Sequence, residues 1–245
     1  MLHFFKQKPL LRNLIPDNHI DIHSHLLPGI DDGATSIKDS VSLVNQMAAI
    51  GFKNIITTPH IVTNIWNNTE ASIKEKHQET APLIEKKCKI TTFNAAAEYT
   101  LDAYFFKKLE TEKLLTLKDN LILVELSYLC PPIQLFDIIF EIQLAGYKPV
   151  LAHPERYLYY HNNFKAYDKL KNLGCVFQLN LLSTVDYYGE HVTKIADKLL
   201  ANNYINFVGS DIHHQNHIDA FERKLAIKNM APLEEAILNN LFFIE

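Results

Sequence analysis

Short apolar stretches alternate with longer amphipathic stretches along this chain, and this alternation limits its fold more than any other feature. The short stretches read as strands at residues 54–60, 91–98, 121–126, 149–153, 175–180 and 206–209, after a first strand that begins at His19. Helices are predicted between them at 36–50, 67–88, from about 102, 133–145, 163–173 and 186–202, with two more after the last strand. Repeated strand–helix units favour a parallel sheet with right-handed crossovers. Seven units predict an α/β fold closed into a distorted (β/α)7 barrel, with an open doubly wound sheet as the alternative.

Several helix boundaries are marked in the sequence. Residues 36–39, Ser-Ile-Lys-Asp, resemble a capping box, and Gly51 ends the helix that they begin. Pro82 lies inside the polar stretch 67–88. Because proline lacks the backbone N–H that a helix interior uses, we expect that helix to be kinked or divided.

The length of the chain allows one or two domains, and a single α/β barrel of this size is ordinary. The chain has 245 residues, of which 47% are hydrophobic, enough to bury a full core over residues 19–245. Residues 1–18 are expected to be an N-terminal extension packed over the bottom of that domain. Contact of this extension with a membrane surface or a partner is the alternative.

Charge and cysteine content narrow the functional classes. A net charge of -4 gives no electrostatic footprint for nucleic acid, and no apolar run reaches the roughly 18 residues that a membrane span needs. The N-terminus lacks the pattern of a signal peptide. Cys88, Cys130 and Cys175 lie far apart, which argues against a disulfide framework and favours a reducing compartment. We therefore expect a cytoplasmic protein.

The stretch from His19 to Gly33 contains the first candidate ligands. It begins like a strand with period two, which places His23 and His25 on the same face. Pro28-Gly29 and Asp32-Gly33 then break the strand into a loop. Imidazole nitrogen and carboxylate oxygen together suit manganese, iron, cobalt or zinc, so this stretch is one edge of a possible metal site.

Other ligand-type residues stand where predicted strands end. In a barrel of parallel strands, the C-terminal ends of all strands meet at one face, and buried carboxylates there need partners. Their convergence from distant parts of the sequence predicts a multinuclear metal site. The candidate ligands are His23, His25, Asp32, His60, Glu98, Glu125, His153, Asp211 and His213.

At these positions the sequence resembles the polymerase-and-histidinol-phosphatase (PHP) superfamily. Residues 19–33, followed by Thr-Thr-Pro-His at 57–60 and His-Pro-Glu-Arg at 153–156, are similar to the metal-dependent bacterial tyrosine phosphatases of capsule and exopolysaccharide operons. The resemblance runs from about residue 19 to 218. It implies a PHP fold, which is a distorted seven-stranded TIM-like barrel, with a trinuclear metal centre.

The resemblance also implies how the ligands are shared among three divalent ions, with manganese as the expected metal. One ion would be held by His23, His25, Glu98 and Asp211. A second would share Glu98 and add Glu125 and His153, and a third would use Asp32, His60 and His213. The implied substrate is the tyrosine-rich tail of a bacterial tyrosine kinase that governs polysaccharide export. The expected oligomeric state stays open.

The chemistry of phosphoryl transfer agrees with that assignment. The reaction needs positive charge on the equatorial phosphate oxygens and an aligned nucleophile, and closely spaced metals can acidify a water into hydroxide. Arg156 is placed to donate bidentate hydrogen bonds to phosphate oxygens, and a salt bridge with Glu155 is the alternative. We expect Arg156, Asp211 and His213 to act in catalysis.

One feature departs from the family pattern. Phosphatases of this kind carry another arginine a few residues beyond the last histidine motif, whereas this chain has no arginine there before Arg223. Either His214 or His217 replaces it, or the metals and Arg156 alone hold the phosphate. Tyrosines 157, 159, 160, 187 and 188 either form an aromatic rim for the substrate ring or cap the barrel, and Asn180 is expected behind the ligands.

Other catalytic schemes lack their residues. A cysteine phosphatase needs arginine six positions after its cysteine, and here Asn94, Phe136 and Leu181 stand at that offset. The sequence contains no phosphate-binding G-x-x-x-x-G-K-[ST] loop and no G-x-S-x-G elbow.

Three hypotheses follow. The first is a metal-dependent phosphotyrosine-protein phosphatase. The second keeps the fold and metals but gives a small-molecule phosphatase, such as one acting on histidinol phosphate. The third is a non-catalytic, metal-stabilised regulator that binds the kinase.

Overall fold

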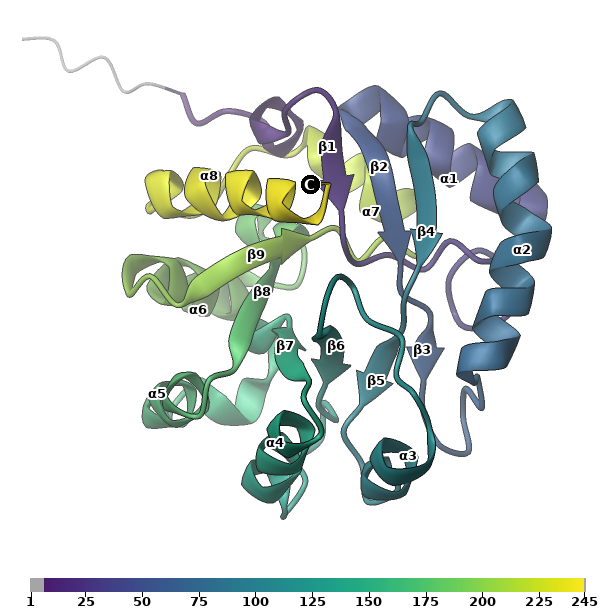
Figure 1. The fold of residues 1–245 in the computed structure, drawn as a ribbon. Coiled ribbons are helices and arrows are strands. Elements are labelled where there is room, and N and C mark those ends of the chain that lie inside the picture. Colours follow the sequence, from purple (N-terminus) through teal and green to yellow (C-terminus); the bar gives the residue numbers. More distant parts are fainter. Residues whose placement is uncertain (1–6, 245) are drawn as a thin grey trace, which may run out of the picture.

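The computed structural model describes residues 7–244, and within them parallel strands form two sheets (Figure 1). The first sheet has the order β1-β2-β4 and the second has the order β3-β5-β6-β7-β8-β9. All of these neighbours are paired in parallel, as repeated strand–helix units require. The strands are β1 (His19–Asp21), β2 (Phe52–Thr57), β3 (His60–Ile61), β4 (Thr92–Ala95), β5 (Glu98–Thr100), β6 (Leu121–Glu125), β7 (Lys148–Ala152), β8 (Val176–Asn180) and β9 (Ile205–Gly209).

Two of the seven predicted strands are each divided in two. The expected strand 54–60 becomes β2 and β3, and the expected strand 91–98 becomes β4 and β5. Pro59 has no N–H to give to a ladder, and the division falls at Thr58-Pro59 in one strand and at Ala96-Ala97 in the other. At each of these two points the polypeptide crosses from the first sheet to the second.

Helices lie along the outside of the two sheets (Figure 1). Six of them lie between one strand and a later one, since parallel strands need a crossover of this kind, and the last two follow the last strand. The helices are α1 (Ile37–Ile50), α2 (Glu70–Lys87), α3 (Phe105–Thr111), α4 (Leu135–Leu144), α5 (Lys165–Asn172), α6 (Glu190–Ala201), α7 (Gln215–Asp219) and α8 (Met230–Asn239).

Helix α1 begins and ends where the sequence predicts, and two other helices differ. The Ser36 side chain accepts a hydrogen bond from the Asp39 N–H, and Gly51 follows the last turn. The expected division of the second helix is wrong, because α2 runs unbroken through Pro82, which lies on its exposed side. Helix α6 begins later than expected, since a 3-10 turn at Leu181–Val185 and then Gly189 precede it.

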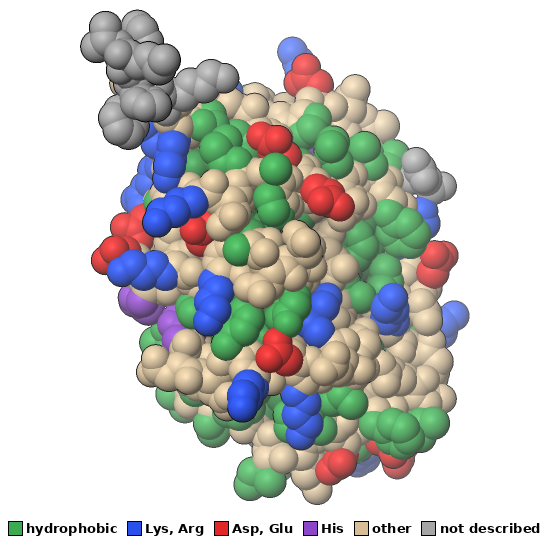
Figure 2. Space-filling model, turned by 90° about the vertical axis from the view of Figure 1, so that its left-hand side faces the viewer, with side chains coloured by type: hydrophobic (Ala, Val, Ile, Leu, Met, Phe, Trp, Pro, Cys, Tyr) green, Lys and Arg blue, Asp and Glu red, His purple; other side chains and the backbone are tan. Residues whose placement is uncertain are grey.

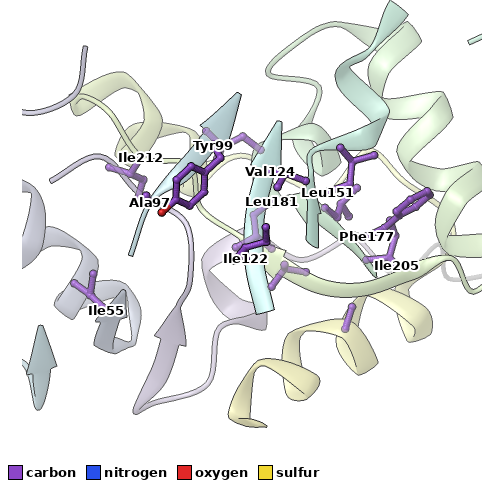
Figure 3. Close-up of a cluster of buried hydrophobic side chains, with 14 of the residues drawn as sticks. Ile55, Ala97, Tyr99, Ile122, Val124, Leu151, Phe177, Leu181, Ile205 and Ile212 are labelled. Atoms are coloured by element: carbon purple, nitrogen blue, oxygen red, sulfur yellow. The ribbon is translucent and has the colours of Figure 1, made fainter. Parts of the chain in front are cut away.

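The interior core collects one face of strands from both sheets. Alternate residues of each strand point inward, among them Ile56 of β2, Leu121 and Leu123 of β6, and Val150 of β7. The other face packs under the helices, and Figure 3 shows this second set on neighbouring strands; it includes Val124, Leu151 and Phe177.

The free edges of the two sheets meet through the segments that follow β1 and β9. The Asp211 N–H donates to the His23 carbonyl at 2.7 Å, and the His25 N–H donates to the Ile212 carbonyl at 2.9 Å. These bonds join the segments without a continuous ladder between β9 and β1 in the described residues. The parallel α/β architecture is therefore confirmed, and closure into a barrel stays a prediction.

Part of the expected extension, residues 7–18, packs against residues 220–227. Leu11 is buried and its N–H donates to the Arg223 carbonyl, while the Lys8 ammonium donates to the Ala226 and Ile227 carbonyls. Residues 1–6 lie outside the described residues, so the prediction for the extension as a whole is not tested.

The surface and the helices carry two further observations. On the face drawn in Figure 2, Lys and Arg side chains are interspersed with Asp and Glu. Among residues 7–244, no helix is both long enough and apolar enough to cross a membrane.

Candidate metal centre

On the inward face of the strands, apolar residues are followed by polar residues at the C-terminal end. On β6 the inward positions read Leu121, Leu123, Glu125, and on β8 they read Val176, Gln178, Asn180. The local sequence therefore places apolar side chains in the core and ligand-type side chains directly above it.

The nine predicted ligands lie together at this end of the sheets. The Asp211 Oδ1 atom lies 3.3 Å from His23 Nε2 and 3.5 Å from His25 Nε2. Glu98 Oε2 lies 3.2 Å from His23 Nε2 and 3.1 Å from His60 Nδ1, and Glu98 Oε1 lies 3.2 Å from His153 Nε2. Further contacts join Glu125 Oε1 to His60 Nδ1 at 3.3 Å, and Asp32 Oδ1 to His60 Nε2 and His213 Nε2, both at 3.5 Å.

Several of these atoms face one another without forming a hydrogen bond. His23 Nε2, His25 Nε2, His60 Nδ1 and Glu98 Oε2 are buried and have no hydrogen-bond partner. An unpartnered buried polar atom is costly, and here four of them point into one space. Nitrogen and oxygen atoms arranged in this way fit divalent cations, which would satisfy all four at once.

The charge of the cluster supports the same fit. Four of the nine residues are carboxylates, and Glu98 and Asp211 are almost fully buried. Burial opposes protonation of His23, but the Glu98 and Asp211 carboxylates outweigh it and raise the pKa of His23 to about 9. Burial likewise opposes ionisation of Glu98, and the neighbouring His23 and His60 hold its pKa well below the usual range. The cluster thus attracts positive charge strongly.

The groups can be compared with the ligand sets that the resemblance implies. His23, His25 and Asp211 lie together as expected, and Asp32, His60 and His213 lie together with His25. The expected set of Glu98, Glu125 and His153 is divided. Glu98 groups with His23 and His153 on one side, and with His60 and Glu125 on the other.

Three buried residues that we did not predict hold the ligands in place. His23 Nδ1 bonds to Gln178 Oε1 at 2.9 Å, and His25 Nδ1 bonds to Asp31 Oδ2 at 2.8 Å. These bonds leave Nε2 of each ring facing the cluster, which is the usual arrangement behind metal-bound histidine. Asp21 accepts hydrogen bonds from the Ser210 N–H and hydroxyl, and so fixes the segment that carries Asp211.

A signal for two of these residues exists in the sequence. Gln178 is a polar residue at an inward position of an otherwise apolar strand, and Asp31 stands beside Asp32 in the first loop. Asn180, which we expected behind the ligands, donates to Asp211 Oδ2 at 2.9 Å.

The backbone at the cluster is constrained. Asp211 and His153 both have positive φ, 51° and 35°, although neither is glycine. Residues in this region cost free energy and are found where the surrounding structure fixes them. Gly209 is also required: a Cβ there would lie 2.3 Å from Gln178 Nε2 and 2.6 Å from His23 Cβ.

A cavity of about 240 Å³ opens above the ligands, and it is lined by Asp32, His60, Tyr128, His153, Arg156, Tyr188, Asp211, His213, His214 and His217. The Arg156 guanidinium lies 4.9 Å from the Tyr128 ring centre and 4.1 Å from that of Tyr188. Its Nη1 donates to Asp211 Oδ2 at 2.7 Å. Two aromatic faces and one carboxylate therefore fix the single arginine of the cavity.

The ion pair of Arg156 is with Asp211 and not with Glu155, so the salt-bridge alternative is wrong. The Glu155 carboxylate is buried and accepts hydrogen bonds from the Ser183 hydroxyl and the Asn180 N–H. Of the tyrosines considered for a rim, Tyr188 lines the cavity, whereas Tyr157 is buried and bonded to the Ala152 carbonyl. Tyr128 also lines the cavity and was not predicted.

His214 and His217 stand where the expected second arginine is missing, and both line the cavity. His217 is nearly buried, and its Nδ1 lies 3.1 Å from the His213 nitrogen and 3.0 Å from the Asp211 carbonyl oxygen. Both contacts hold the ring against the segment that carries Asp211 and His213. Burial lowers the pKa of His217 to about 4, so the ring is neutral at physiological pH.

Comparison with known proteins agrees with this geometry. The tyrosine-protein phosphatase YwqE of Bacillus subtilis (strain 168) is 30% identical over 196 residues, which cover 80% of this chain and 77% of YwqE. A solved structure matches with a TM-score of 0.74 and 27% identity. It comes from work on YwqE from Bacillus subtilis and CpsB from Streptococcus pneumoniae, which are described as unique metal-dependent tyrosine phosphatases. That match covers 92% of this chain and 86% of the other.

A more distant likeness concerns the fold alone. The histidinol phosphate phosphatase of Lactococcus lactis, solved with zinc, L-histidinol and phosphate, has a TM-score of 0.50 at 12% identity, over 92% of this chain and 94% of that one. The family described as capsular polysaccharide synthesis, CpsB/CapC, matches residues 19–229. The chain belongs to this CpsB/CapC family.

Proposed function

We propose that this protein is a metal-dependent protein-tyrosine phosphatase that hydrolyses the phosphate ester of phosphotyrosine. The observation that carries the proposal is the group of unpartnered buried nitrogen and oxygen atoms below a cavity with an arginine held between two tyrosine rings. The relatives named tyrosine-protein phosphatases support the same reaction.

The nine residues would hold three divalent ions. His23, His25, Glu98 and Asp211 would bind the first, Glu98 and His153 a second together with Glu125, and Asp32, His60 and His213 a third. Donors that are all imidazole nitrogen and carboxylate oxygen favour manganese, with iron, cobalt or zinc as alternatives. Bound ions of this kind supply positive charge to the phosphate oxygens and acidify the attacking water.

The chain's own residues orient and bind the substrate. Arg156 offers N–H groups to phosphate oxygens from a guanidinium that Asp211 and two rings already fix, so little freedom is lost on binding. His217 lines the cavity at the stretch where the second arginine is missing. Water adds to phosphorus, the bond from phosphorus to the tyrosine oxygen breaks, and one proton of the water ends on that oxygen, so that inorganic phosphate and the free tyrosine leave. We assign catalytic roles to Arg156, Asp211 and His213.

The aromatic walls of the cavity suit an aryl ester. Tyr128 and Tyr188 present rings beside Arg156, so a phosphotyrosine ring can lie against them while its phosphate reaches the arginine. The physiological substrate in this proposal is a tyrosine-phosphorylated bacterial kinase of polysaccharide export, met in the cytoplasm. The free thiols of Cys88, Cys130 and Cys175 agree with a reducing compartment.

Residues 19–245 form one PHP-type domain in this proposal, with the two sheets as parts of one distorted barrel. The core shared by strands of both sheets and the hydrogen bonds between residues 23–25 and 211–212 support this interpretation.

Substrate choice tests the proposal. With manganese present, we expect the kcat/KM for a phosphotyrosine peptide to exceed that for histidinol phosphate and for the matched phosphoserine peptide. His23→Ala and Asp211→Ala should abolish the release of phosphate from the phosphotyrosine peptide. A preference for histidinol phosphate, or wild-type turnover in either variant, would contradict the proposal.

A further inference from the structure

An apolar groove lies next to the candidate metal centre, between the start of α3 and the start of α4. Its volume is about 470 Å³, and the chain segments that follow β5 and β6 form it. Buried Leu101 and Ile138 lie at its base. Its other lining residues include Ala103, Ser127, Pro131 and Pro132. We call it the α3–α4 groove.

The groove and the metal centre share a wall. Thr100 lines the groove, and its hydroxyl donates to Oε1 of the candidate ligand Glu125 at 2.6 Å. The loop 127–134 borders both spaces, because Ser127 and Cys130 line the groove while Tyr128 lines the cavity above the candidate ligands. A polypeptide whose phosphotyrosine occupies the cavity can therefore reach the groove with a neighbouring residue.

Three of the polar side chains that line the groove already bond within the protein itself. The Ser127 hydroxyl oxygen accepts the Leu129 N–H, and the Asp102 carboxylate accepts the Tyr104 N–H. With the Thr100 hydroxyl bonded to Glu125, the groove offers mainly apolar surface. Such a surface selects an apolar or aromatic side chain over a polar one.

The loop beside the groove exposes large apolar side chains. Leu129 is 90% exposed and Ile133 is fully exposed, on the loop whose Tyr128 lines the cavity above the ligands. Exposed apolar residues gathered on one loop mark a contact surface for another molecule. A small phosphate ester would fill only the cavity and would leave this surface in water.

We infer that the α3–α4 groove binds an apolar or aromatic side chain of the same polypeptide that carries the phosphotyrosine, close to it in sequence. The groove thereby makes the enzyme selective for protein substrates with such a neighbour. This inference rests on the proposed function and names the substrate class of that site.

The test compares two phosphotyrosine peptides on the full-length chain with manganese. One peptide carries leucine or phenylalanine within three residues on each side of the phosphotyrosine, and the other carries serine at those positions. We expect wild type to favour the apolar peptide by about tenfold in kcat/KM, mostly through KM, as burial of one such side chain provides. Ile133→Glu should remove most of that preference, and Leu238→Glu, an exposed leucine on α8, should keep it.

The outcomes separate the two claims. Release from neither peptide by wild type would contradict the proposed function itself. Release at equal kcat/KM from both peptides, or an unchanged preference in Ile133→Glu, would overturn the inference alone. If Ile133→Glu instead converts a dimer into a monomer in sedimentation and leaves the preference intact, a second copy covers the groove and the inference is wrong.

Discussion

At the scale of residues, the ligands depend on hydrogen-bond partners behind them. Gln178 and Asp31 each bond to Nδ1 of a histidine whose Nε2 faces the cluster. Such partners fix the tautomer and the orientation of the ring, so a ligand bonded in this way loses little freedom when it binds a cation. The same residues do not touch a substrate, and their effect should appear in metal binding first.

Replacing Gln178 tests this dependence. Gln178→Leu removes the bond to His23 Nδ1 and keeps a side chain of similar size, so we expect manganese affinity to fall by about 10–100-fold. Titration calorimetry, in which manganese is added to protein freed of metal by a chelator, measures this affinity. The control is Gln46→Leu, which removes an exposed bond between Gln46 and Gln215. Wild-type affinity in Gln178→Leu would show that the bond does not position His23.

His19 predicts a pH dependence of stability that lies away from the metal centre. Burial lowers the pKa of His19 to about 4, and neither ring nitrogen has a hydrogen-bond partner. The unfolded chain, with a histidine pKa of about 6.5, takes up the proton first as the pH falls. This group therefore costs stability progressively between the two pKa values.

We expect wild type to lose about 2 kcal/mol more unfolding free energy than His19→Leu between about pH 7.5 and pH 5. Urea denaturation at the two pH values measures the difference, and the pairwise comparison cancels the titration of all other groups. Equal losses in the two proteins would mean that His19 stays accessible to protons in the folded state.

At the scale of elements, the strand ends place the site, and glycine allows them to approach. Gly209 ends β9 against Gln178 of β8 and His23 after β1. The sequence predicts the position of the strands well because their apolar runs are short and bounded. The sequence does not predict the division at Thr58-Pro59, because that division depends on the pairing of β2 and β3 with different sheets. It does not predict the unbroken α2 either, because that helix depends on Pro82 lying on its exposed side.

A methyl group at position 209 should disturb the site more than the fold. In Gly209→Ala, the added Cβ would displace Gln178 and His23, and we expect at least about a tenfold loss of manganese affinity, as for a lost partner of a ligand. Gly146→Ala is the control, since its φ is 85° but no atom lies within 4 Å of the added Cβ. It should lose about 1 kcal/mol of stability and keep metal binding. Equal metal affinities in the two variants would contradict this account.

At the scale of the whole molecule, the convergence of distant residues was predictable, and the surroundings of the cavity were not. Parallel strands bring their C-terminal ends to one edge, which is why Glu98, Glu125 and Asp211 could be placed together from sequence alone. Tyr128 and the α3–α4 groove depend on the path of the loop 127–134, for which the sequence holds no periodic signal. His214 and His217 both line the cavity where the second arginine is missing, and the sequence alone does not choose between them.

If cations bound by this cluster carry the phosphotyrosine phosphatase activity, the release of phosphate depends on them. The most direct measurement is phosphate release from a tyrosine-phosphorylated peptide by the chelated protein, before and after manganese is returned, with and without alkylation of the three free thiols. We expect no release after chelation, recovery with manganese, and no effect of alkylation. Release that persists without metal, or that alkylation abolishes, would contradict this expectation.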